Sequence, residues 1–289
     1  MKFLSLRTLI IIVFGTFVLA SSSQAVPIFS SATISSSFSF TEVLGSSEVS
    51  IAFDGTNYWT AIGGSAGGTR LAKYDASGSN LGTYAPGLDF RSLTADGAGD
   101  VYARAYNNTS IFIQSSDGVF TTTGVSVGGV SSQPKVILNG DGTEYIAHDT
   151  NGTVRRWDLS GNALSSVSLS GYGANSGESG YYQDSAISAA GDYWLTYSEG
   201  ILSAWDDLGN RVDQTTLLGA GSNFNSHLSQ SYANGMFFVM DNDESTWRGY
   251  ELNLDLVSVP EPSSLLILSL GLLALGLRRE KVRLKKSRA

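Results

Sequence analysis

The sequence predicts an all-β protein built as a β-propeller of about five four-stranded blades. Between residues 30 and 258 no long helical periodicity occurs, and short runs instead alternate apolar and polar residues. These runs are rich in aromatic residues and are bounded by Gly, Asp and Asn, which is typical of strands joined by tight turns. Gly78, Gly118, Gly161 and Gly209 follow one another at intervals of 40, 43 and 48 residues. This spacing is in the range of four-stranded propeller blades.

The first landmark of each repeat is a glycine turn that precedes an aromatic or aliphatic strand. The five predicted strands are 58–62, 101–106, 144–147, 193–197 and 236–240. The turns before them are Asp54-Gly55, Asp96-Gly97, Asn139-Gly140-Asp141-Gly142, Ala190-Gly191 and Asn234-Gly235. Gly supplies the positive φ that tight hairpins need, and an Asp or Asn side chain caps the turn.

The second landmark is an aromatic-Asp-x-x-Gly turn that leads into the last strand of the repeat. It occurs at Tyr74-Asp75, Trp157-Asp158 and Trp205-Asp206, with weaker copies at Ser116-Asp117-Gly118 and Tyr250-Glu251-Leu252. Five units fit residues 49–258, and we expect an extra strand near 38–43 to close the ring against the last blade. The turn resembles degenerate propeller repeats of exported bacterial proteins. The alternative is a pair of β-sandwiches or a jelly roll, which would alternate without a repeat.

The C-terminal residues 259–289 form a separate segment. An uncharged apolar run, 265–277, predicts a short transmembrane helix, and seven of the next eleven residues are basic. The positive flank predicts a cytoplasmic C-terminus and an outward-facing body. The alternatives are a buried core helix and a plain tail anchor.

This tail resembles the PEP-CTERM protein-sorting domain. The parts of that domain occur here in order: Pro260-Glu261-Pro262, the apolar helix 265–277, and Arg278-Arg279. The resemblance implies that a membrane-embedded exosortase recognises the triplet, with Arg278-Arg279 as the stop signal, and releases the protein to the envelope or the outside. It also implies that the nucleophile belongs to the sorting enzyme.

Residues 1–25 predict a secretory signal peptide. Lys2 and Arg7 precede an apolar stretch, and Ser23-Gln24-Ala25 is a small-x-small site with cleavage expected after Ala25. The alternative is an uncleaved N-terminal anchor. Both ends therefore predict export of a β-propeller-like domain at 26–258, transiently held in the inner membrane and finally at the cell surface or secreted.

The charge of the body limits its partners. Setting aside Lys2, Arg7, the seven tail bases and two tail glutamates, 24 acidic and nine basic residues remain. A net charge near −15 repels nucleic acid and attracts cations or basic partners, so no nucleic-acid role is expected. The chain contains no Cys, so the fold depends on its core rather than on disulfides.

The residues typical of common active sites are missing from the sequence. Two histidines, His148 and His227, stand far apart, and no Cys accompanies them, which argues against a zinc site. No Gly-x-Ser-x-Gly elbow, phosphate loop or dinucleotide fingerprint stands at a strand–helix junction. We therefore expect a protein that is not an enzyme and has no cofactor.

Carboxylates offer the one enzymatic alternative. Asp54, Asp96 and Asp141 recur at one corner of the repeat, where two of them at a suitable separation would serve a glycosidase or lyase. Recurrence favours turn caps instead, because catalytic residues seldom recur in every blade. Calcium is a further alternative for 139–144 and 241–244, which carry oxygen ligands but lack the twelve-residue loop signature.

The role of the tryptophans has two interpretations. Trp157 and Trp205 would stack on sugar rings if exposed, whereas tryptophans at repeat positions usually fill the core between blades. The sequence thus predicts an exported binding or structural component of the surface or extracellular matrix. Its expected partners are an exosortase and, through the propeller, exopolysaccharide or surface glycans. The alternative is a secreted carbohydrate-active enzyme.

Overall fold

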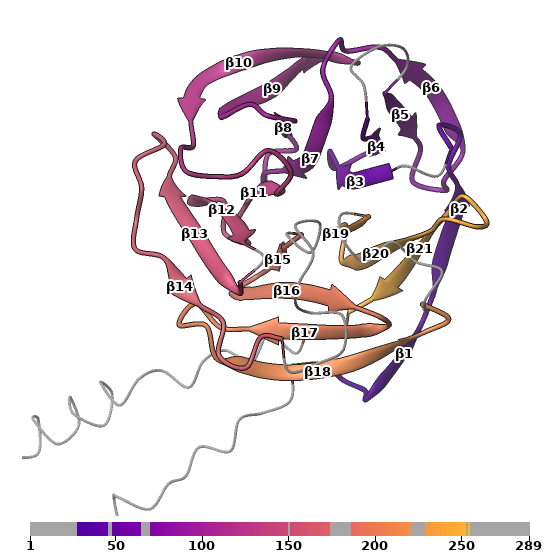
Figure 1. Cartoon of the computed structure of the whole chain (residues 1–289). Coiled ribbons are helices and arrows are strands. Elements are labelled where there is room, and N and C mark those ends of the chain that lie inside the picture. The colour runs from indigo at the N-terminus through magenta and orange to yellow at the C-terminus, as the bar shows by residue number, and fades with distance from the viewer. Residues whose placement is uncertain are drawn as a thin grey trace, which may run out of the picture.

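The computed structural model shows five β-sheets arranged in a ring around a central axis (Figure 1). It describes residues 28–45, 48–64, 70–149, 151–173, 186–220, 229–252 and 254. The signal peptide predicted at 1–25 and the tail at 259–289 lie outside these residues. In the described part of the chain, no helix has the length and apolar character needed to cross a bilayer.

The first three blades follow the chain strictly. Blade 1 comprises β3 (Glu48–Phe53), β4 (Tyr58–Ile62), β5 (Leu71–Tyr74) and β6 (Asn80–Tyr84). Blade 2 comprises β7 (Phe90–Ala95), β8 (Val101–Ala105), β9 (Ser110–Ser116) and β10 (Val119–Ser126). Blade 3 comprises β11 (Val136–Leu138), β12 (Glu144–Asp149), β13 (Thr153–Asp158) and β14 (Val167–Ser168). In each blade the first strand lies nearest the axis (Figure 1).

The last two blades each take one strand from the N-terminal segment. Blade 4 comprises β15 (Ser188–Ala190), β16 (Tyr193–Ser198), β17 (Ile201–Trp205) and β18 (Arg211–Leu218), with β1 (Thr33–Ser35) added parallel to β18. Blade 5 comprises β19 (Gln230–Ala233), β20 (Met236–Asp241), β21 (Thr246–Glu251) and β2 (Phe38–Thr41). The five-bladed propeller predicted from the repeat is therefore confirmed.

Ring closure by the N-terminal segment is also confirmed. The predicted strand near 38–43 is β2, which pairs antiparallel with β21 and covers its open edge. The Tyr250-Glu251-Leu252 copy of the second landmark lies at the end of β21 and does not form a turn within the blade. The reason is topological: the fourth strand of blade 5 comes from the other end of the chain.

Glycines of the second landmark allow neighbouring blades to touch. Gly209 has a φ of 81°, and a Cβ atom placed there would lie 2.3 Å from the carbonyl oxygen of Ser168 in blade 3. Gly161 approaches Ser126 of blade 2 in the same way, and Gly118 approaches Tyr84 of blade 1. The glycine in this turn is therefore required both by the positive φ and by the close approach of the preceding blade.

The central axis is closed by polar contacts between innermost strands. The Ser92 hydroxyl donates to the carbonyl oxygen of Val136 (2.7 Å), and the Leu93 amide donates to the Ser50 hydroxyl (2.9 Å). The buried Lys135 side-chain nitrogen donates to the Gln230 carbonyl and to the Ser231 hydroxyl (2.9 Å for the latter). These contacts join blades 1, 2, 3 and 5 across the middle of the ring.

Candidate functional site

One end of the propeller collects the hairpins that join the first to the second strand and the third to the fourth strand of the blades. We name this end the turn face. Its hairpins touch across blades, because Gly99 of blade 2 approaches Asp54 of blade 1 and Gly140 of blade 3 approaches Gly191 of blade 4. The three candidate aspartates all lie on the turn face, each in a hairpin of a different blade.

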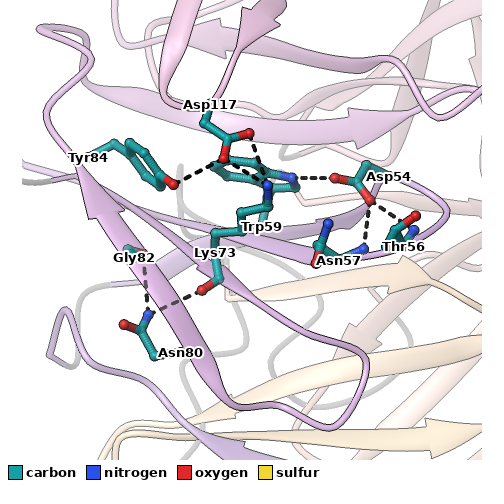
Figure 2. Close-up of polar contacts among 9 residues, drawn as sticks. All are labelled: Asp54, Thr56, Asn57, Trp59, Lys73, Asn80, Gly82, Tyr84 and Asp117. Atoms are coloured by element: carbon teal, nitrogen blue, oxygen red, sulfur yellow. Dashed lines mark hydrogen bonds and ion pairs between the residues drawn. The ribbon is translucent and has the colours of Figure 1, made fainter.

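Asp54 caps its own hairpin, as Figure 2 shows. One carboxylate oxygen accepts the backbone N–H groups of Thr56 (2.9 Å) and Asn57 (2.6 Å), and the other accepts the indole N–H of Trp59 (2.8 Å). Burial raises the pKa of Asp54, but these hydrogen bonds outweigh it and the net shift is downward. The carboxylate is thus ionised and fully used within its turn.

Asp96 and Asp141 are capping residues too. Asp96 accepts the backbone N–H groups of Ala98 and Asp100 at 2.9 Å. Asp141 accepts the Thr143 hydroxyl at 2.6 Å and the Thr143 N–H at 3.1 Å, and the hydroxyl contact chiefly lowers the pKa of Asp141. The geometry at all three aspartates is that of turn caps.

The second-landmark aspartates behave in the same way. Asp75, Asp158 and Asp206 each accept backbone N–H groups from residues two and four positions later. The pKa of Asp158 is lowered, chiefly by the side chain of Asn162. These carboxylates define hairpins and leave little capacity for an acid–base role.

The junction of blades 1 and 2 is filled on the turn face (Figure 2). The Lys73 ammonium group pairs with Asp117 of the next blade at 2.8 Å and lies 5.0 Å from the centre of the Trp59 ring. The Tyr84 hydroxyl donates to the same carboxylate at 3.2 Å. An alkylammonium group is therefore held between a carboxylate and an aromatic face.

The junction of blades 3 and 4 instead contains a pocket of about 460 Å³, a volume typical of ligand sites. Its wall comes from three hairpins and from strands β12, β13, β16 and β18: Asn139, Gly140, Asp141, Thr143, Glu144, Arg156, Gly191, Asp192, Tyr193, Trp194, Asp206, Asp207 and Val212. Five of these side chains are acidic and one is basic. The pocket therefore has a negative potential that attracts cationic groups.

Arg156 occupies the position in its repeat that Lys73 occupies in blade 1, two residues before the turn aspartate. Unlike Lys73, it is held within its own blade, because Glu144 accepts two of its N–H groups at 2.7 and 2.8 Å. This hydrogen bonding is the main cause that raises the pKa of Arg156. Among the described residues, the exposed Asp192 and Asp207 carboxylates have no hydrogen-bonded partner. The blade 3–4 junction thus has exposed carboxylates without a hydrogen-bonded partner, where the blade 1–2 junction has an ion pair between the two blades.

The tryptophans are structural. Trp157 is 2% exposed and Trp205 is 0% exposed, and Trp59, Trp194 and Trp247 are buried as well. A buried ring cannot offer its face to a glycan, so the stacking interpretation of Trp157 and Trp205 does not hold and the core interpretation does. The sequence could not locate Tyr193, which is partly exposed in the pocket wall.

The remaining sequence candidates are the histidines and the acidic turn at 139–144. Among the residues that the structure describes, no three His, Cys, Asp or Glu side chains converge as metal ligands. The Asn139 side chain caps its turn by accepting the N–H groups of Thr143 (2.9 Å) and Glu144 (3.0 Å). His148 is buried with its ring centre 4.6 Å from that of Tyr172, and His227 lies outside the described residues.

Comparison with known families identifies the C-terminal segment, which lies outside the described residues. The model of the PEP-CTERM protein-sorting motif matches residues 258–280. The chain carries a PEP-CTERM motif. The match spans Pro260-Glu261-Pro262 and Arg278-Arg279, the residues on which the sequence resemblance rested. This motif implies export, C-terminal membrane anchoring before exosortase cleavage, and an extracellular propeller.

Comparison with solved structures shows the fold. A glutaminyl cyclase from Myxococcus xanthus aligns with a TM-score of 0.54 and 11% identity, over 78% of this chain and 98% of the cyclase. A virginiamycin B lyase from Staphylococcus aureus aligns with a TM-score of 0.40 and 12% identity, over 73% of this chain and 72% of the lyase. No curated protein sequence matches the chain. The cyclase likeness extends to the fold and not to an activity.

Proposed function

We propose that this protein is a non-enzymatic component of the cell surface or extracellular matrix, and that its propeller binds a partner there. The observation that carries the proposal is the PEP-CTERM motif attached to a propeller. The turn-face carboxylates support it, because Asp54, Asp96 and Asp141 are engaged in their own hairpins. The glycosidase alternative raised for Asp54, Asp96 and Asp141 would need two of these three carboxylates free to exchange protons with a substrate.

The pocket between blades 3 and 4 is the site where we place the partner. Asp192 and Asp207 supply negative charge, Tyr193 supplies an aromatic surface, and Asn139 and Thr143 supply polar groups. The Lys73–Asp117 pair over Trp59 shows which chemistry suits such a junction in this protein. We therefore propose a surface glycan that carries free amino groups as the ligand class.

Binding is tested with the full-length chain in mild detergent and a glucosamine oligosaccharide. Replacing Asp192→Asn and Asp207→Asn together is expected to weaken binding at least tenfold, because charge-assisted hydrogen bonds contribute about 1.5–3 kcal/mol. The matched control is Asp100→Asn, an exposed carboxylate on the turn face of blade 2, which leaves affinity unchanged. Equal affinity for the N-acetylated oligosaccharide of the same length would contradict an amine-selective pocket.

Sorting is tested separately by replacing Pro260-Glu261-Pro262 with alanines. We expect the variant to remain unprocessed in the membrane of its host, because the recognition element is gone. The measurement is the distribution of the protein between membrane and medium. Unchanged release would contradict exosortase sorting.

A further inference from the structure

The C-terminal end of the propeller emerges on the turn face. The Leu252 N–H donates to the carbonyl oxygen of Gly235 at 3.3 Å, and Gly235 lies in the hairpin between β19 and β20. Leu254 then forms an antiparallel bridge with Phe29. The last described residue is therefore attached beside the hairpins of this face.

The N-terminal end lies at the same place. The buried Phe29 donates its N–H to Asp213 at 2.8 Å, and Asp213 lies in β18 shortly after the Asp206 hairpin. The N-terminal and C-terminal ends of the propeller thus lie together on one rim of the turn face, beside blades 4 and 5.

The segment between Leu254 and Pro260, which we call the tether, joins the propeller to the sorting triplet and is short. Pro260 follows Leu254 by six residues, and the motif match begins at residue 258. A fully extended chain spans at most about 3.3–3.6 Å per residue, so these six residues reach about 20 Å. The rim of the turn face therefore stays within that distance of the triplet as long as the chain is anchored.

We propose that the anchored precursor holds its turn face toward the membrane, and that exosortase cleavage unmasks the pocket between blades 3 and 4. This proposal rests on the proposed function, since it assumes membrane anchoring and a binding role for the pocket. While anchored, the turn face is held within about 40 Å of the predicted helix at 265–277, since eleven residues separate Leu254 from Leu265. The membrane on that side restricts the approach of a polymeric ligand. After cleavage, the same face is free on all sides.

The charge of the turn face shows that the tether, and not attraction, keeps it near the lipid. The carboxylates of Asp192, Asp206 and Asp207 lie in hairpins of blade 4 on this face. Carboxylates are repelled by anionic headgroups over about a Debye length, near 8 Å at physiological ionic strength. Release is therefore expected to be complete once the tether is cut.

Two exposed leucines at opposite ends of one strand provide the test. Leu208 lies in the hairpin before β18 on the turn face and is 73% exposed, whereas Leu218 ends β18 at the opposite face and is 49% exposed. Because the chain has no Cys, Leu208→Cys and Leu218→Cys each introduce a single reactive thiol. Both are made in the full chain with the triplet replaced by alanines, and the protein is kept in its native membranes.

The thiols are labelled with a maleimide attached to a 5-kDa polyethylene glycol, with a small maleimide as the control for reactivity. We expect the large reagent to label Leu218→Cys fully and Leu208→Cys several-fold less, while the small reagent labels both. Inserting a 20-residue Gly/Ser spacer after Leu254 should restore labelling of Leu208→Cys. The same two cysteine variants, made with the wild-type triplet and collected after release from the membrane, should be labelled equally by the large reagent.

Equal labelling of the two cysteines in the anchored chain would overturn the proposal and leave the sorting function intact. A failure of the spacer to restore labelling would overturn it as well, because the protection would then not depend on tether length. Recovery of the chain outside the membrane fraction would overturn both the sorting function and this inference.

Discussion

Glu42 is the residue that joins the two ends of the ring. Its carboxylate is buried and accepts the Tyr74 hydroxyl of blade 1 (2.5 Å), the Trp247 indole N–H of blade 5 (3.0 Å) and the Leu44 N–H (3.1 Å). Burial, and then the neighbouring Glu42 charge, raises the pKa of Tyr74 well above its usual range. The tyrosine therefore remains a donor at every physiological pH.

Replacing Glu42→Gln should destabilise the fold by about 1–3 kcal/mol, because an amide NH₂ would replace one acceptor among buried donors. Urea unfolding of the two proteins measures the difference. The control is Glu244→Gln, whose carboxylate is 62% exposed and pairs with Arg248. That variant should change stability by less than about 1 kcal/mol. A similar loss in both variants would contradict the ring-closing role of Glu42.

Lys135 makes stability depend on pH. Burial lowers the pKa of the Lys135 amine well below the usual value, whereas the same amine in the unfolded chain keeps a pKa of about 10.4. Between the two values the unfolded state binds more protons, so stability rises with pH up to about 10, with a slope of at most about 1.4 kcal/mol per pH unit. Urea unfolding of wild type and Lys135→Met from pH 7 to pH 10 should show this slope in the wild type only. Parallel curves would contradict it.

At the residue scale, the sequence predicted which aspartates cap turns but not which residues line the pocket between blades 3 and 4. The capping roles of Asp54, Asp96 and Asp141 follow from local sequence, since each caps its own hairpin. The pocket could not be predicted, because Asp141, Asp192 and Asp207 come together only through the packing of two blades. Lys135 carried no local signal either, since its burial depends on Gln230 and Ser231 of a distant blade.

At the scale of elements, the repeat predicted the second strand of each blade closely. The predicted strand 58–62 is observed as β4 (Tyr58–Ile62), and 236–240 as β20 (Met236–Asp241). β1 was missed, because its three residues lie in a serine-rich stretch without alternation and pair only with the edge of β18. An element that short is specified by its partner strand rather than by its own sequence.

The inter-blade glycine contact yields a prediction with a matched control. Gly209→Ala should destabilise the propeller by about 2–5 kcal/mol, which combines a left-handed backbone cost of about 1–2 kcal/mol with an overpacking cost of about 1–3 kcal/mol. Gly142 also has a positive φ, 71°, but a Cβ atom there meets nothing within 4 Å. Gly142→Ala should therefore show the backbone cost alone. Equal losses in thermal or urea unfolding would contradict a steric role for Gly209.

At the scale of the whole molecule, the propeller fold and the sorting motif answer different questions. The described residues show a five-bladed propeller closed by β2, and the PEP-CTERM motif at 258–280 implies where the propeller is delivered. A fold shared with a glutaminyl cyclase at 11% identity does not specify an activity. The sorting motif and the turn-face pocket together are what make this chain a candidate surface-binding protein.

The most direct test of this account is the intact mass and the location of the protein purified from its native host. We expect a mass that lacks residues 1–25 and the Arg-rich tail, found in the medium or the outer layer of the cell. A mass that retains the tail, found in the inner membrane, would contradict sorting by an exosortase and would make the protein a permanently anchored propeller.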